Sequence, residues 1–554
     1  MEQSTKDQTL LFFVMPIFSL FFGVTAFLVE RPFSLAGWLR ILEGTNAFVT
    51  DGAALGGLSG ALFNSCLMGI FAWGALLFAR TKPTGRVLGA FFACMGAGMF
   101  GATPLTTLPI VLGGFLYARL RRESFSRVCP YVLQSCALSP AVAALYFYTG
   151  QPSLFGVVLG LLAGVVTGMC ALPLALHTRV LHQGFNLYSA GIPLGVMGIL
   201  LFSVYREAVL APQGKAVGYI SPMVVSPGTP WIFFGLFGFL FIAAILSGVL
   251  LRQKDAQPYL SLCASSGLET DFLLLFGAGN TLCNLGLTGL LLLGYFAIAG
   301  ISFNGAAAGA LLYGLCWTGA GVHPRNALPI LLGYLFTSLL LHTPLNATEL
   351  VIGVCFALGL APISGVFGGL YGILSGALHA FLMPAVLGLN GGFNLYTGAF
   401  ASGVIALFMF PLLHEISRRG SRSALSSGRS EITSELIQEA SALVDGMDAA
   451  LSPVEPKAAD GRRVPGERYL LLRNIMVCTA AVLFCLSLFP RGPLAGYGNL
   501  LRFIAYILGA LAYGAEIMLL TDGFRARKPP REMLMPYIFG VLYLILGFSY
   551  LLEH

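Results

Sequence analysis

The stretch GATPLTTLPIVLGGFLY at residues 101–117 is echoed by GVHPRNALPILLGYLF at residues 321–336. Leu-Pro-Ile occurs at 108–110 in the first stretch and at 328–330 in the second, an offset of 220 positions. Both stretches are apolar, and both carry a second proline near their start. A repeated apolar segment of this kind predicts that the chain contains two copies of one membrane unit.

Other residues align at fixed offsets. The offset of 220 pairs Thr50-Asp51 with Thr270-Asp271, Asn64 with Asn284, Gly85 with Gly305 and Gly89 with Gly309. The motif GFNLY occurs at 184–188 and 392–396, an offset of 208, which also pairs Gly160, Gly164 and Gly168 with Gly368, Gly372 and Gly376. A deletion near 348–364 reconciles the two offsets, so we interpret the pattern as a duplication.

The composition determines the class of protein. Of the 554 residues, 57% are hydrophobic and 10% are charged, whereas soluble domains carry about 25% charged residues. Apolar runs of roughly 17–25 residues recur, the length at which a helix crosses about 30 Å of hydrocarbon. Because a helix satisfies its own backbone hydrogen bonds in lipid, we expect an all-α polytopic membrane protein. Soluble globular, disulfide-scaffold, collagen-like and β-barrel classes are excluded.

Hydropathy predicts fourteen spans, then a polar stretch, then three more spans. The fourteen lie near 9–29, 53–79, 86–102, 105–119, 128–149, 153–177, 184–205, 231–252, 272–299, 305–322, 326–341, 347–362, 363–387 and 392–413. The last three lie near 469–489, 498–520 and 533–551. The expected domains are repeat one at 1–205, an external connecting loop at 206–230, repeat two at 231–413, a cytoplasmic segment at 414–468 and a three-helix membrane segment at 469–554.

Basic residues orient the spans, because lysine and arginine are retained on the cytoplasmic side. The loop after the fourth span carries four arginines between residues 119 and 127, whereas its counterpart HTPLNATE at 342–349 carries no lysine or arginine. Each copy has seven spans, an odd number, so the second copy enters the membrane the opposite way up. We expect a multi-pass protein of the cell inner membrane with a cytoplasmic N-terminus.

The expected architecture is therefore two inverted-topology repeats of about seven helices each plus three C-terminal transmembrane helices. Inverted repeats of this kind are typical of secondary transporters and some channels. The alternative is a duplicated scaffold without a transport pathway.

At its GFNLY motifs the sequence resembles a bacterial membrane-protein family known as domain of unknown function 1576. Members carry a GGFNLY-type motif followed by a small-residue helix, and GGFNLYTG at 391–398 matches this pattern. The resemblance covers roughly residues 9–413 and implies no assigned activity. The sequence also resembles bacterial urea transporters, with inverted halves, through Phe-Asn-Gly at 303–305 and Leu-Pro at 328–329.

A transporter holds its solute near the midplane, where broken helices leave backbone groups free. Thr103 to Pro109 and His323 to Pro329 combine two prolines with short flanking helices. Each proline removes a backbone donor and disfavours helix before it. Thr103, Pro109, His323 and Pro329 are therefore candidate substrate-binding residues.

The GFNLY motifs supply four more candidates, Asn186, Tyr188, Asn394 and Tyr396. Glycine permits a sharp turn, and asparagine can cap the helix that follows. The motifs either break two helices at related depths or form tight turns at the membrane interface with their tyrosines in the aromatic belt. The sequence leaves both alternatives open.

Asn64 and Asn284 complete the candidate site. They lie at matching mid-span positions, where an asparagine normally faces protein or water. A hydrogen bond between helices explains them as well as a solute contact does. Asp51 and Asp271 begin matching spans, and we expect N-caps there rather than a proton or cation site.

No HExxH, GxSxG, Walker or dinucleotide-binding motif occurs in the sequence, and paired carboxylates are absent from the apolar spans. We expect no enzymatic activity, no catalytic residue, no metal site and no cofactor. None of the 11 cysteines forms a CxxC pair, which indicates packing residues. Helix N-termini at the breaks would favour neutral or anionic solutes.

The polar stretch 414–468 contains helical spacing of apolar residues at 430–447, which predicts an amphipathic helix that docks on the bundle or on a partner. Residues 452–467 have the composition of a flexible linker. The last three spans have no counterpart in the repeat and suit oligomerisation or closure of the bundle.

The function that we predict is transport, by a carrier or a channel, of a small neutral or anionic solute at the interface between the repeats. The alternative is a membrane scaffold or sensor that signals through 414–468. The expected partners are a small-molecule solute and the lipid bilayer, a homo-oligomer is left open, and no nucleic-acid partner is expected because the net charge of +7 is spread over short loops.

Overall fold

The structure is a computed structural model that describes residues 2–30, 33, 35–44, 51–148, 152–211, 225–252, 257–387 and 389–424. Residues 1–151 and 155–453 belong to one compact unit. The second unit, 152–154 and 454–554, lies almost wholly outside the described residues. The expected amphipathic helix at 430–447, the linker and the last three spans also lie outside them.

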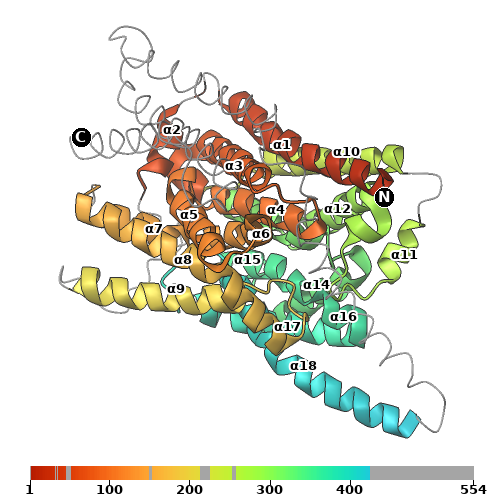
Figure 1. Ribbon diagram of the computed structural model, residues 1–554. Coiled ribbons are helices and arrows are strands. Elements are labelled where there is room, and N and C mark those ends of the chain that lie inside the picture. Colours follow the sequence, from red (N-terminus) through yellow and green to blue (C-terminus); the bar gives the residue numbers. More distant parts are fainter. Residues whose placement is uncertain are drawn as a thin grey trace, which may run out of the picture. The chain divides into compact units, whose positions relative to one another are not determined.

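Every regular element in the described ranges is a helix (Figure 1). The first half contains α1 (Glu2–Val29), α2 (Leu35–Leu42), α3 (Gly52–Phe78), α4 (Gly85–Met99), α5 (Pro104–Arg121), α6 (Phe125–Ser135), η1 (Cys136–Leu138), α7 (Ser139–Tyr146), α8 (Leu154–His182), α9 (Gly191–Tyr205) and η2 (Arg206–Leu210). The second half contains α10 (Pro230–Leu251), α11 (Tyr259–Ala264), α12 (Phe272–Ile298), α13 (Gly305–Gly314), η4 (Leu315–Trp317), α14 (Pro324–Leu341), α15 (Thr348–Ala357), η5 (Leu358–Leu360), α16 (Ala361–Phe367), α17 (Gly369–Leu387) and α18 (Thr397–Ala424).

The prediction of an all-α polytopic membrane protein is confirmed. Nine helices in the described part of the chain are long and apolar enough to cross a membrane. Large apolar side chains on their outer surfaces are exposed, for example Trp231 and Leu250 of α10 at 89% and 84%. Such side chains are expected to face lipid, because water would not favour them there.

Several element bounds differ from the expected spans. Helices α9 and α18 begin at Gly191 and Thr397, after the GFNLY motifs rather than at them. Helix α18 continues to Ala424, past the expected end at residue 413. The expected connecting loop at 206–230 starts with the π-helical turn η2, and its residues 212–224 lie outside the described ranges.

The two halves carry the same local structures 220 positions apart. Gly57 of α3 and Gly277 of α12 both kink their helices, with φ of +75° and +77°, a region that favours glycine. Asp51 caps α3 by accepting from the Ala53 N–H, and Asp271 caps α12 by accepting from the Leu274 N–H. Both aspartates are therefore N-caps, as the sequence indicates.

The proline-containing segments begin helices rather than break them. Thr103 and His323 are the N-caps of α5 and α14, each in a reciprocal capping box with the residue three positions on. The prolines that directly follow them occupy the first helical turn, where a missing N–H costs nothing. Pro109 and Pro329 lie inside α5 and α14, and both helices continue through them.

The breaks lie elsewhere, one inside the expected span 128–149 and one near the end of the expected span 347–362. The 3₁₀ turn η1 separates α6 from α7, and η5 separates α15 from α16. Pro140 and Pro362 follow these turns in the first turn of the next helix. The interrupted helices are almost entirely buried, so their distorted backbone is surrounded by protein rather than lipid.

Matched helices of the two halves pack against each other in antiparallel fashion. In α4 and α13–η4, a Cβ at Gly89 would collide with the carbonyl oxygen of Cys316, and one at Gly96 would lie 2.9 Å from the Gly309 carbonyl oxygen. Residue numbers rise along one helix as they fall along the other. Close backbone approach through glycine is the usual way for helices to pack tightly in lipid.

Helices α9 and α18 show the same relation. A Cβ at Gly191 would lie 3.0 Å from the Cβ of Ala399, one at Gly195 would meet the ring of Phe400, and one at Gly403 would meet the side chain of Ile192. Gly191 and Ala399 are matched positions, at the offset of 208. The two halves therefore meet through pairs of matched helices that run in opposite directions.

We predict that Gly89→Ala destabilises the protein, because the added methyl group meets backbone that cannot move aside. Overpacking of this kind costs about 1–3 kcal/mol. The matched control is Gly74→Ala in α3, where nothing lies within 4 Å of the added Cβ. Thermal unfolding of both variants in detergent checks this: a melting temperature for Gly89→Ala equal to that of Gly74→Ala would contradict the packing.

Candidate functional site

Both GFNLY segments are buried turns between helices. The first joins α8 to α9 and the second joins α17 to α18. In each turn the asparagine carboxamide oxygen accepts a hydrogen bond from a tyrosine N–H, at 3.1 Å for Asn186 and Tyr188 and 2.8 Å for Asn394 and Tyr396. Both tyrosine side chains are fully buried. A place in the aromatic belt is therefore excluded for them, and the asparagines cap turns rather than helices.

Each turn is hydrogen-bonded to the broken helix of the other half. The N–H of Leu187 donates to the carbonyl oxygen of Gly359 in η5 at 3.0 Å. The N–H of Leu395 donates to the carbonyl oxygen of Ala137 in η1 at 2.9 Å. The motif in each copy thus stabilises the break in the opposite copy.

A buried cluster of aromatic side chains lies where the two turns meet. The rings of Tyr188 and Tyr396 are 5.1 Å apart and perpendicular, and the Tyr188 hydroxyl donates to the Tyr313 carbonyl oxygen at 2.7 Å. In the described residues, the hydroxyls of Tyr313 and Tyr396 and the carboxamide nitrogen of Asn394 have no hydrogen-bond partner. Buried polar groups are rarely left unpaired, so these atoms suit a water or a bound ligand.

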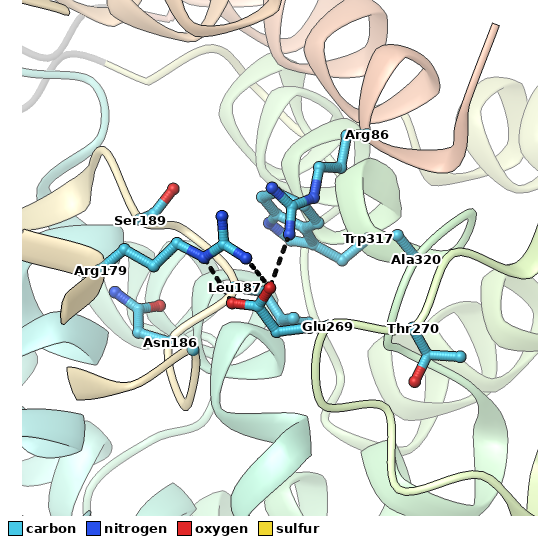
Figure 2. A pocket seen from close by; sticks show the side chains of 10 residues that line it. Arg86, Arg179, Asn186, Leu187, Ser189, Glu269, Thr270, Trp317 and Ala320 are labelled. Carbon is cyan, nitrogen blue, oxygen red and sulfur yellow. Dashed lines mark hydrogen bonds and ion pairs between the residues drawn. The ribbon is translucent and has the colours of Figure 1, made fainter. Parts of the chain in front are cut away.

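A charged cluster joins the two halves beside the first turn. Arg179 at the end of α8 holds Glu269 in a bidentate pair, with Nε at 2.5 Å from Oε1 and a terminal nitrogen on Oε2. Arg86 of α4 adds a contact of 3.3 Å to Oε2. The exposed fractions of the three side chains are 19% for Arg86, 12% for Arg179 and 9% for Glu269. Figure 2 shows both guanidinium groups converging on the carboxylate.

This cluster lines a small cavity between the halves. Its volume of about 20 Å³ is room for about one or two water molecules. The lining residues are Arg86, Arg179, Gly184, Asn186, Leu187, Ser189, Glu269, Thr270, Trp317 and Ala320.

A second cavity shares three of these residues, Arg86, Ser189 and Trp317, and extends to Gln134. The Trp317 indole nitrogen and the Gln134 carboxamide oxygen are buried without a partner in the described ranges. The two cavities thus adjoin each other, and their mostly apolar walls carry one unpaired donor and one unpaired acceptor among the described residues.

Of the residues predicted from sequence, Asn186 lines the charged cavity, and Tyr188, Asn394 and Tyr396 meet at the buried aromatic cluster. Asn64 and Asn284 do not line the cavities. Each donates twice to backbone carbonyls, one at the end of α4 or η4 and one in the loop that follows, and accepts once, from Trp38 and Tyr259 respectively. These contacts fully occupy both side chains.

The proline-segment candidates also lie outside the two cavities. Thr103 and His323 serve as caps, and Pro109 and Pro329 pack against glycines of α8 and α17. Burial lowers the pKa of His323 to about 4, and its Nε2 lies 3.0 Å from the Ser265 carbonyl oxygen. The imidazole is therefore neutral at pH 7 and can donate to that carbonyl.

Sequence reasoning missed the charged cluster because it searched for chemistry shared by both copies. The counterparts of Arg86, Arg179 and Glu269 at the same offsets are Ala306, Leu387 and Val49. Unmatched basic residues were interpreted only as markers of span orientation, so their pairing with a carboxylate was not predicted.

Comparison with family models gives one match, to a protein family described as "Protein of unknown function (DUF1576)", over residues 31–207 and 251–415. The chain belongs to this family. The starts of the two matched regions differ by 220 positions (31 and 251) and their ends by 208 (207 and 415), the same offsets that relate the two halves. No curated protein and no solved structure matches the chain.

We predict opposite stability effects for matched tyrosines. Tyr396→Phe removes a hydroxyl that has no partner in the described residues, so stability should be unchanged or higher. Tyr188→Phe removes the hydrogen bond to the Tyr313 carbonyl and should cost about 1 kcal/mol. Thermal melts of the two variants in detergent decide this. Equal destabilisation by both would show that the Tyr396 hydroxyl is paired within the protein.

Proposed function

We propose that the protein transports a small solute, as a carrier or a channel, through a site at the interface between its halves. The observation that carries the proposal is the cavity with two arginines of the first half and a glutamate of the second. Arg86 and Arg179 lie at ends of α4 and α8 and Glu269 lies in the loop before α12, yet their side chains are at most 19% exposed. Buried charged side chains are costly, and on this proposal the cluster lies at one mouth of the solute pathway.

The arrangement of the halves supports the same proposal. Antiparallel packing of matched helices, α4 with α13 and α9 with α18, is what inverted-topology repeats would produce at their pseudo-two-fold axis. The broken helices and the two cavities lie where such repeats would meet. On this proposal the N-terminus is cytoplasmic in the inner membrane, with the loop after α5 on the same side.

The two arginines favour an anionic solute over a neutral one. Guanidinium groups bind carboxylates and other oxyanions through paired hydrogen bonds. The local charge includes Asp271, which accepts from the Gly85 N–H at 2.8 Å, beside Arg86. Burial raises the pKa of this carboxyl to about 6, so it is mostly ionised at pH 7. While Glu269 stays in place, Asp271 and Glu269 balance the two arginines, so an anionic solute would bind by taking the place of a carboxylate.

The test is flux of small anions in liposomes that contain the purified protein. Arg179→Gln should reduce flux at least about tenfold, because it removes the bidentate anion-binding group. The control is Arg206→Gln, which alters an arginine paired with its exposed neighbour Glu207 outside both cavities. Full flux in a well-folded Arg179→Gln variant would refute this site.

Deletion of residues 425–468 separates the alternative function from transport. A transporter should retain its flux without this segment, whereas a sensor or scaffold that signals through it would lose its output. A protein that carries no solute yet loses a signalling output would favour the alternative.

A further inference from the structure

The Arg179–Glu269 pair has the geometry of a bound carboxylate ligand. Two guanidinium nitrogens of Arg179 contact the two carboxylate oxygens, and Arg86 adds a third contact to one of them. A free carboxylic acid would be bound by two arginines in the same manner. In this structure the carboxylate comes from the protein itself.

The two sides of the pair are supported differently. Arg86 and Arg179 project from helices α4 and α8, whereas Glu269 belongs to the short loop between α11 and α12. The backbone of Glu269 has φ of +53°, a left-handed conformation that few non-glycine residues adopt. The arginines are therefore held rigidly, and the carboxylate is held by a strained, non-helical segment.

The size of the cavity indicates that a solute would replace the Glu269 carboxylate rather than bind beside it. The cavity volume of about 20 Å³ has no room for an organic solute while the Glu269 carboxylate is in place. Removal of that carboxylate would free a space of matching size and shape between the same two arginines. The Trp317 indole nitrogen lines the same cavity, has no partner among the described residues and can donate to a solute.

We propose that Glu269 is a tethered counter-ion which the carboxylate of a small monocarboxylate solute replaces on Arg179 and Arg86. The inference rests on the proposed function and names its substrate class. When the solute carboxylate binds, the Glu269 carboxylate leaves the two arginines and turns to solvent with the loop between α11 and α12. The charge that faces Arg86 and Arg179 is then the same before and after the exchange, so no unpaired charge is left buried.

The experiment measures acetate binding to the purified full-length protein by the fluorescence of Trp317, with Trp317→Phe as the blank for the other tryptophans. In the wild type, acetate should change the emission saturably and chloride should not. Glu269→Gln removes the competing carboxylate and keeps its shape, so acetate should bind about tenfold more tightly or better. Arg179→Gln should abolish the response.

A second variant covers the case in which Glu269→Gln does not fold. Glu269→Asp keeps the charge but shortens the side chain, which prevents bidentate contact, so acetate should bind more tightly than in the wild type. Unchanged acetate affinity in the variants that fold would overturn the proposal, as would an equal response to chloride. Tight acetate binding without acetate flux would refute the proposed function and leave this inference standing; anion flux that acetate does not inhibit would refute only the inference.

Discussion

The structure depends on a reciprocal pair of backbone hydrogen bonds. Each GFNLY turn donates one N–H to the 3₁₀ break in the opposite half, from Leu187 to Gly359 and from Leu395 to Ala137. An interrupted helix leaves carbonyl groups without their regular partners, and in lipid that is expensive. The breaks η1 and η5 are tolerated because the other half surrounds them and supplies a donor. The N–H donor for each break comes from the opposite half.

The reciprocal hydrogen bonds also explain where the aromatic side chains lie. Since both turns are drawn into the interface between the halves, Tyr188 and Tyr396 face each other there and not the membrane surface. The scaffold is matched between the halves, but the charges are not. Arg86, Arg179 and Glu269 have apolar counterparts, so the charged cluster occurs at only one of the two related positions. In a transporter built from inverted repeats, that difference would distinguish the two ends of the pathway.

Much of the fold could be predicted from sequence because hydropathy and the repeat are long-range, redundant signals. The helical membrane class and the aspartate N-caps follow from them, and the family follows from the GGFNLY motif. The short helices α2 and α11 were missed, because six to eight residues leave little periodic signal. The breaks were misplaced because Pro109 was weighed more heavily than Pro140, although only Pro140 begins a new helix after an interruption.

The candidate site was less predictable. Asn186 was found because its motif is duplicated, whereas Glu269 was missed because it precedes a duplicated Thr-Asp pair without being part of it. Its pairing with Arg179 joins residues 90 positions apart, and nothing in local sequence encodes such a contact. Asn64 and Asn284 were also found because they are duplicated, but both make structural hydrogen bonds to backbone carbonyls and line neither cavity.

The central claim, that the halves are interlocked in opposite directions, is tested most directly by disulfide cross-linking of α9 to α18. In a variant without native cysteines and with a protease site between residues 212 and 224, cysteines would be introduced at 192 in α9 and at 403 in α18. The pair should form a disulfide that holds the cleaved halves together, because a Cβ at Gly403 would lie against the side chain of Ile192, which brings the two Cβ atoms within reach of a disulfide. A parallel arrangement that kept Gly191 beside Ala399 would instead bring Gly195 next to Gly403. Cross-linking of 195 to 403, with none of 192 to 403, would contradict the account.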